Sequence, residues 1–299
     1  MNNRQSQRFS GHESFVCRYG WLPKLHRAVV ADPAVLRNEE RAMHTLGIGR
    51  NMVKSIQFWG EATGVIRSRE GHGHRPGPVG DRLFGRAGWD EYLETLESLW
   101  LLHWWITTKA SLAAWDEVFG EGGLQRFDKR GLVEALARRG EGKARTLVAS
   151  TLEQHASIFL QTYYQESRGI DDTSWCPLQD LALLTASRDN EGQVAFATNL
   201  KAPVGLTLRL FSAALVEFLA GYEGQTVALS EVLRSAYSPG IVFGLDEGLL
   251  RVFLNQAVEG PLRRALKFND TADTQSLRLD AQKVDPELRF DTVAEIAHA

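Results

Sequence analysis

The chain has 299 residues, enough for two domains or three small ones, and its 43% hydrophobic and 24% charged residues are ordinary for a globular protein. Its two cysteines, Cys17 and Cys176, exclude a disulfide framework and a cysteine-based zinc cluster. No apolar run approaches the ~20 residues of a membrane span, and the polar N-terminus resembles no secretory signal. We therefore expect a cytoplasmic protein without membrane contact.

The net charge of −3 conceals an uneven distribution along the chain. Residues 1–86 contain 14 Lys and Arg against 7 Asp and Glu, a balance of +7. The remainder contains 20 against 30, a balance of −10. A basic N-terminal third on an acidic remainder favours one end that binds a polyanion and another that makes other contacts.

The first 64 residues predict three helices. Apolar residues at helical spacing indicate a helix over Trp21–Val30. A short second helix is expected after Asn38, a favourable N-cap, and before Gly47. The third runs from about 49 to 64. Two helices joined by a glycine-containing turn are typical of a helix-turn-helix.

The third helix has two different faces. Val53, Ile56 and Trp59 recur on its inner side. The opposite side carries Arg50, Asn51, Lys54 and Gln57. An α-helix fits the DNA major groove, where Arg bonds guanine, Asn bonds adenine and Lys suits a phosphate. The alternative is that the helix pair is only a packing unit or a docking module for protein.

A hairpin is expected after these helices, with strands at Val65–Arg67 and Pro78–Phe84 around a flexible tip at Glu70–Gly77. Helix, helix and hairpin in this order are the outline of a winged helix. Its wing would carry Arg67, Arg69, His72, His74 and Arg75. The two histidines could share a metal, but no third ligand accompanies them, and a loop that contacts DNA is the better interpretation.

The rest of the chain is expected to be mostly helical. A tryptophan-rich helix should begin at its cap, Asp90, and contain a core histidine, His103. Further helices are expected at about 129–139, 143–165, 205–221, 228–237 and 246–259. Hairpins are expected around "DNEG" and around "NDTADT", the second with Arg263, Arg264 and Lys267 on its first strand.

These elements predict a mainly α (α+β) fold. The expected units are a basic winged helix-turn-helix domain at 1–120, a helical segment at 121–168, and a C-terminal α+β domain at 169–299 that contains a second winged-helix-like module. The last residues, from Pro286, should form a short closing helix or stay disordered.

One adjacent pair of residues could carry catalysis. His12 and Glu13, in "SGHESF", could activate a water or hold a divalent cation. The alternative is that both make turn hydrogen bonds. No nucleophile elbow, phosphate-binding loop, zinc-protease or dinucleotide motif is present. Composition and spacing alone therefore predict a DNA-binding protein and no particular enzyme.

Three stretches resemble a bacterial family: Phe9 to Lys24 ("FSGHESF…RYGWLPK"), Leu46 to Trp59 ("LGIGRNMVKSIQFW") and Tyr92 to Trp105 ("YLETLESLWLLHWW"). The family is that of the SspB-like components of Ssp-type DNA phosphorothioation, a phage-defence modification that replaces a phosphate oxygen by sulfur. The family was formerly a domain of unknown function. Its genes accompany those of a cysteine desulfurase, an ATPase and a PAPS-reductase-like protein, which the resemblance implies as partners beside double-stranded DNA.

The resemblance implies a protein that nicks DNA for sulfur insertion. His12 and Glu13 lie in a matching stretch and are the leading catalytic candidates, with Arg18 and Lys24 as DNA-contacting stabilisers of the reacting phosphate and Mg²⁺ or Mn²⁺ as a cofactor. Two alternatives stay open: a non-catalytic DNA-binding adaptor that recruits the sulfur-transfer proteins, and a winged-helix transcriptional regulator. A sulfur-relay role for Cys17 is a further alternative.

Overall fold

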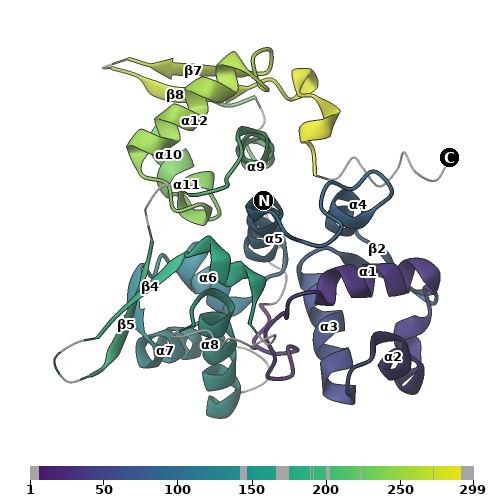
Figure 1. Ribbon diagram of the computed structural model, residues 1–299. Coiled ribbons are helices and arrows are strands. Elements are labelled where there is room, and N and C mark those ends of the chain that lie inside the picture. The colour runs from purple at the N-terminus through teal and green to yellow at the C-terminus, as the bar shows by residue number, and fades with distance from the viewer. Residues whose placement is uncertain are drawn as a thin grey trace.

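Three units of similar element order follow one another along the chain. The computed structural model describes residues 7–141, 147–165, 175–188, 190, 192–199, 203–222, 224–271 and 273–290. In the middle and C-terminal units a helix is followed by a short strand, further helices and a hairpin, and in the N-terminal unit a 3₁₀ turn takes the place of that strand. We call these units the N-terminal module (21–76), the middle module (113–198) and the C-terminal module (208–279). Figure 1 shows them around helix α5. The predicted α+β class is confirmed.

The N-terminal module begins with the three expected helices. Its elements are α1 (Trp21–Ala31), the 3₁₀ turn η1 (Val35–Arg37), α2 (Glu39–Leu46), α3 (Arg50–Ala62), β1 (Ile66–Arg69) and β2 (Gly73–Pro76). The Asn38 side chain accepts a hydrogen bond of 2.9 Å from the backbone N–H of Arg41 and caps α2. Gly47, with φ of 60°, ends that helix in the left-handed conformation. Helix bounds, cap and stop all agree with the prediction.

The predicted return strand at Pro78–Phe84 is wrong, because this segment is helix α4. Pro78 suits the first turn of a helix, and Val79 and Leu83, four residues apart, are both buried. The true return strand, Gly73–Pro76, pairs with β1 from Ile66 opposite Pro76. The backbone N–H of His74 also donates to the Pro33 carbonyl at 2.8 Å, which holds the hairpin against the α1–α2 connection.

Helix α5 (Leu96–Lys109) is the central helix of the molecule. Its N-cap is Thr95, and the prediction of Asp90 as cap is wrong. Asp90 instead accepts the backbone N–H groups of Glu94 and Thr95 at 2.8 and 2.9 Å and fixes the loop before the helix. His103 is fully buried between the Tyr163 hydroxyl and the Val242 carbonyl, each at 2.8 Å, and is a core histidine as expected.

The middle module crosses a predicted boundary. It comprises α6 (Ala113–Phe119), β3 (Arg126–Asp128), α7 (Lys129–Gly140), α8 (Ala149–Tyr163), the 3₁₀ helix η2 (Pro177–Leu181), β4 (Leu184–Arg188) and β5 (Val194–Thr198). Its strand order is β3-β5-β4, with Phe127 opposite Phe196. The segment expected at 121–168 and the domain expected at 169–299 therefore share one sheet.

The C-terminal module repeats that topology. It comprises α9 (Leu208–Ala220), β6 (Val227–Ala228), α10 (Leu229–Arg234), α11 (Pro239–Val242), α12 (Glu247–Glu259), β7 (Leu266–Asp270) and β8 (Gln275–Leu279), followed by the 3₁₀ turns η3 (Ala281–Lys283) and η4 (Pro286–Leu288). Its strand order, β6-β8-β7, matches that of the middle module. The second predicted hairpin is present, but β7 begins after Arg263 and Arg264, so only Lys267 lies on the strand. Of the expected closing helix, 291–299 lies outside the described residues.

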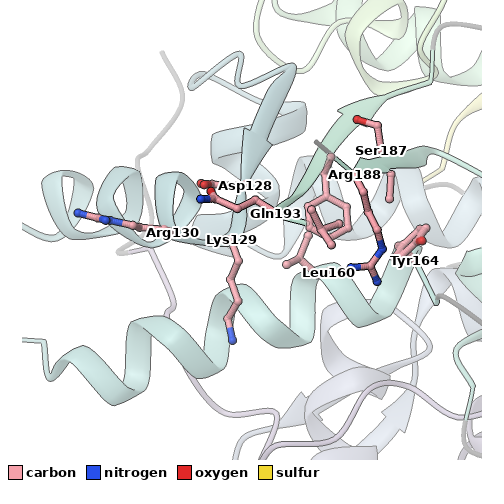
Figure 2. Close-up of a pocket in the computed structure, with 11 residues that line it drawn as sticks. Asp128, Lys129, Arg130, Leu160, Tyr164, Ser187, Arg188 and Gln193 are labelled. Atoms are coloured by element: carbon pink, nitrogen blue, oxygen red, sulfur yellow. The ribbon is translucent and has the colours of Figure 1, made fainter. Parts of the chain in front are cut away.

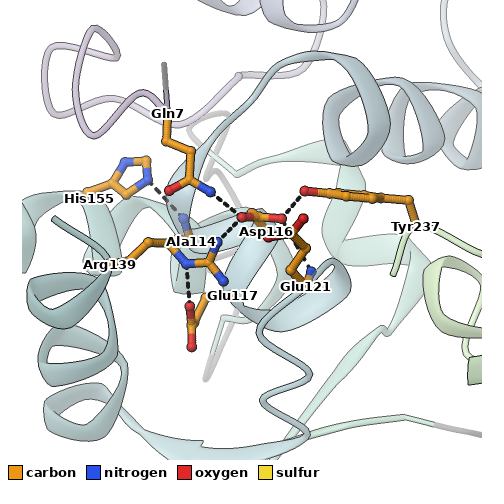
Figure 3. Close-up of polar contacts among 8 residues, drawn as sticks. All are labelled: Gln7, Ala114, Asp116, Glu117, Glu121, Arg139, His155 and Tyr237. Carbon is orange, nitrogen blue, oxygen red and sulfur yellow. Dashed lines mark hydrogen bonds and ion pairs between the residues drawn. The ribbon is translucent and has the colours of Figure 1, made fainter. Parts of the chain in front are cut away.

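The buried carboxylate of Asp116 joins segments from three parts of the chain (Figure 3). It accepts hydrogen bonds from Arg139 of α7, from the Tyr237 hydroxyl between α10 and α11, and from the Gln7 side chain. Arg139 also donates to Glu117 at 2.6 Å. Burial and the neighbouring Asp116 raise the pKa of Tyr237 well above its ordinary value, so its hydroxyl stays a donor. Within the described residues, no helix is long and apolar enough to span a membrane.

The first prediction concerns this carboxylate. Asp116 is 3% exposed, so Asp116→Ala should leave Arg139 with Glu117 alone and remove the acceptor of the Tyr237 hydroxyl, which should lower the free energy of unfolding by roughly 1–3 kcal/mol. The control is Glu134→Ala, which removes the exposed ion pair of Glu134 with Arg130 and should cost at most about 0.5 kcal/mol. Urea titrations measure both values. Equal losses in the two variants would contradict the role given to Asp116.

The second prediction concerns acid stability. Burial lowers the pKa of His12 and of His103 from 6.5 to about 4, and that of His155 to about 3. The unfolded chain binds protons at these sites below about pH 6.5, whereas the folded chain does not. The free energy of unfolding should therefore be fully retained above pH 6.5 and fall towards pH 4, by up to ~1.4 kcal/mol per pH unit for each histidine. Urea midpoints that stay constant from pH 7.5 to 5 would be inconsistent with neutral buried rings.

Candidate nucleic-acid interface

The outer face of α3 presents the four residues that the sequence analysis selected. Arg50, Asn51 and Lys54 are exposed and Gln57 is half-buried. The Arg50 guanidinium forms a 2.8 Å ion pair with Glu39 of α2. Lys54 forms no ion pair within the described part of the chain. Among the described residues, this face therefore presents Lys54 without an ion pair, the Arg50–Glu39 ion pair and the Asn51 amide.

Glu61 connects this helix face to the hairpin. Its carboxylate accepts hydrogen bonds from the Gln57 amide at 3.1 Å and from the His74 ring at 3.0 Å. Burial acts to raise the pKa of Glu61, but the hydrogen bonds from His74 and Gln57 outweigh it and the pKa is lowered. A carboxylate that is charged at neutral pH thus holds β2 beside α3.

The hairpin carries arginines that face one another. Arg67 and Arg75 are directly opposite in the β1–β2 register. Like charges at opposed positions destabilise a hairpin unless an anion lies between or beside them. Arg67 packs over the Trp105 ring at 6.0 Å, whereas Arg69 and Arg75 are exposed and have no ion-pair partner among the described residues. The arrangement suits the phosphates of a polyanion.

Arg18 and Lys24 lie near this surface but are partly engaged. The Arg18 guanidinium stacks over the rings of Phe15 and Trp21, at 5.5 and 5.7 Å. Lys24 is exposed and donates to the carbonyl of Leu46 at 3.2 Å, at the end of α2. The structure therefore brings Lys24 to the turn before α3, while Arg18 is held against aromatic rings.

His12 and Glu13 do not converge on one point. His12 is 2% exposed and stacks on His155 of α8, with ring centroids 5.4 Å apart. The Ala114 N–H donates to Nε2 of His155, so the other ring nitrogen of His155 carries the proton and donates to Nε2 of His12 at 3.2 Å. The basic nitrogen of His12 is therefore occupied. Glu13, by contrast, is exposed.

The loop that presents Glu13 is strained and joins two helices. Glu13 and Ser14 have φ of 48° and 64°, a region that residues other than glycine seldom adopt and that is enriched at functional sites. The loop is tied to α8 through the Ser14–Gln154 hydrogen bond. It is tied to α3 through the Phe15 carbonyl, which accepts from Trp59 at 2.9 Å. Figure 1 shows this segment between α3 and α8.

The sequence analysis missed two residues of this region. The Arg8 guanidinium lies 4.7 Å from the centre of the Phe58 ring on α3 and acts electrostatically on both His12 and Glu61. His155 positions His12 from a helix more than a hundred residues away. Neither residue lies in a motif, and only the fold brings them here.

Two chemical roles find no support in the geometry. Cys17 is 3% exposed and burial raises the pKa of its thiol, so it is unsuited to relay sulfur. No group of three His, Cys, Asp or Glu side chains in the described residues could hold a metal ion. Asp116, Glu117 and Glu121 lie on and just after α6. The Asp116 carboxylate already accepts hydrogen bonds from Arg139 and Tyr237. The residues present thus do not form a ready metal cage.

Comparison with known proteins identifies the fold. A magnesium-bound crystal structure of SspB superposes with a TM-score of 0.81 at 24% sequence identity, covering 92% of this chain and 83% of that one. A second SspB crystal structure gives 0.79 at 24% identity, covering 92% and 84%. No functionally curated protein matches the sequence. The expected resemblance is thereby confirmed as a shared SspB-like fold.

The sequence also matches, over residues 9–294, the family described as protein of unknown function (DUF4007). The match extends over nearly the whole chain, from the segment before His12 to the residues after η4. The chain therefore belongs to the DUF4007 family.

Proposed function

We propose that this chain is the DNA-binding and DNA-nicking component of an Ssp-type phosphorothioation system. The observation that carries the proposal is the junction of α3 with the β1–β2 hairpin through Glu61, which combines an exposed helix face and a hairpin with exposed arginines in one module. The SspB-like fold supports the same system. Double-stranded DNA is the polyanion that a helix and a hairpin of this size fit.

In this proposal the N-terminal module acts as a winged helix. The first turn of α3 enters the major groove, where Arg50 and Asn51 contact base edges. For this contact the Arg50 guanidinium leaves its ion pair with Glu39 and binds guanine. Lys54, Arg69 and Arg75 contact phosphates, which adds affinity without sequence preference. Lys24 lies at the turn before α3 and contacts the flanking backbone.

The cutting step is assigned to the loop at Glu13. Hydrolysis of a phosphodiester needs a base that takes a proton from water and positive charge that stabilises the phosphorane. Glu13 is the exposed carboxylate on the strained loop between α3 and α8, and His12 anchors that loop without acting as the base. Arg8 and Arg18 supply nearby positive charge, and a Mg²⁺ or Mn²⁺ ion would be held mainly by the DNA phosphates and not by a protein cage.

A second candidate function is a non-catalytic adaptor. Its specific support is that the basic nitrogen of His12 is occupied and that, within the described part of the chain, no group of three His, Cys, Asp or Glu side chains could hold a metal ion beside Glu13. Such an adaptor would bind DNA through α3 and recruit the cysteine desulfurase, the ATPase and the PAPS-reductase-like protein through its acidic remainder.

The third prediction tests the DNA face. Lys54→Ala should weaken binding of all duplexes alike and reduce the slope of log affinity against log salt by about 1. Asn51→Ala should instead reduce the preference between sequences by roughly 1–3 kcal/mol at one base pair. Lys283→Ala, an exposed lysine on η3 beside Asp280, is the matched control. If Lys54→Ala and Lys283→Ala show the same salt slope in fluorescence anisotropy, α3 is not the DNA face.

The fourth prediction tests the cutting step. Purified protein with Mn²⁺, alone and with its partner proteins, should convert supercoiled plasmid to open circles, and Glu13→Gln should slow this by at least ~100-fold because it removes the base. Glu40→Gln, an exposed carboxylate on α2, should keep the rate. Nicking that persists in Glu13→Gln would place the chemistry elsewhere. DNA binding without any nicking would favour the adaptor.

A further inference from the structure

A cavity of about 560 Å³ opens in the middle module, on different elements from the proposed DNA face. It lies between the start of α7, the end of α8 and the β4–β5 hairpin (Figure 2). The residues that matter for its chemistry are Lys129, Leu160, Tyr164, Arg188, Gln193 and Phe196. A volume of this size is typical of sites that take a small ligand.

The inner wall of the cavity is apolar and aromatic. The rings of Tyr164 and Phe196 meet edge to face, with centroids 5.4 Å apart and planes at 76°. Leu160 from α8 lies beside them. Phe196 is buried within the sheet, whereas Tyr164 is half-buried and so presents part of its ring to the cavity. Such a wall favours a flat aromatic ligand over an aliphatic one.

The rim of the cavity is positively charged. Lys129 is exposed and has no ion-pair partner among the described residues. Arg188 extends past Tyr164 on the other side of the opening and donates to the Gly192 carbonyl at 3.4 Å. The acidic residue of the lining, Asp128, accepts the Gly131 N–H at 2.6 Å as the N-cap of α7. Lys129 and Arg188 therefore flank the aromatic wall, Arg130 of the lining is paired with Glu134, and Gln193 lies between the strands and α7.

We propose that this cavity binds a nucleotide. Its base would pack against Tyr164 and beside Phe196, Gln193 would hydrogen-bond the base edge, and Lys129 and Arg188 would contact the phosphate. The nucleotide is either a free mononucleotide or one that has left its pair in a DNA strand. The second source, an unpaired nucleotide of a DNA strand, rests on the proposed function. The experiment below distinguishes it from a free mononucleotide.

The experiment uses the full chain and two kinds of probe. Calorimetry measures the binding of dAMP and dCMP, and anisotropy compares a fully paired duplex with the same duplex bearing one unpaired nucleotide. Tyr164→Leu keeps apolar volume but removes the ring, and Arg188→Gln removes the charge. Arg278→Gln, an exposed arginine on the β8 strand of the C-terminal module, is the control.

We expect either mononucleotide binding or a preference for the unpaired duplex, reduced roughly tenfold in Tyr164→Leu and in Arg188→Gln and unchanged in Arg278→Gln. Mononucleotide binding identifies the free source, and a preference for the unpaired duplex alone identifies the DNA source. Absence of both, or equal values in all variants, would overturn the proposal. Affinity for the paired duplex, which depends on Lys54, reports separately on the proposed function.

Discussion

The buried carboxylate of Asp116 is the contact that joins the middle module, the C-terminal module and the residues before α1. A buried charge is tolerated only where hydrogen bonds replace the lost water, and here the donors come from Gln7, Arg139 and Tyr237. These residues belong to the N-terminal segment, to α7 and to the C-terminal module. Because one carboxylate accepts from all three, a shift of any of these segments would remove a hydrogen bond from a buried charge.

This contact also sets the path of the N-terminal segment. After Gln7, the backbone N–H of Arg8 bonds the Ser111 carbonyl at 2.8 Å, and its carbonyl accepts from Ala113 at 3.0 Å. Further along, His12 accepts a hydrogen bond from the His155 ring, and the Phe15 carbonyl accepts one from Trp59 of α3. Residues 7–15 thus contact both the middle module and α3. The loop that carries Glu13 is therefore joined to α3 through the Phe15 carbonyl and to α8 through Ser14.

Local signals determined most of what the sequence could predict. Asn38 and Gly47 mark α2, and the apolar spacing of α3 separates its inner and outer faces correctly. Residues 78–84 were misread because a proline at the start of a buried helix and a short apolar strand have similar patterns. The pairing of Phe127 with Phe196 and the contact of His12 with His155, 143 residues apart, depend on tertiary structure alone. The exposed face of α3 was therefore predictable from the sequence, whereas the contact that holds His12 against His155 was not.

The electrostatics of this loop separate the two candidate functions. A single carboxylate, Glu13, beside surface cations would face the phosphates of any DNA that lies on α3, and the two negative groups repel one another. Cutting therefore requires enough positive charge at the loop to exceed that repulsion. Arg8 is already shared between Phe58 and Glu61, and Arg18 is stacked on Phe15 and Trp21. Intrinsic nicking should thus depend on an added cation, whereas an adaptor that only binds DNA through Lys54 and the hairpin arginines needs none.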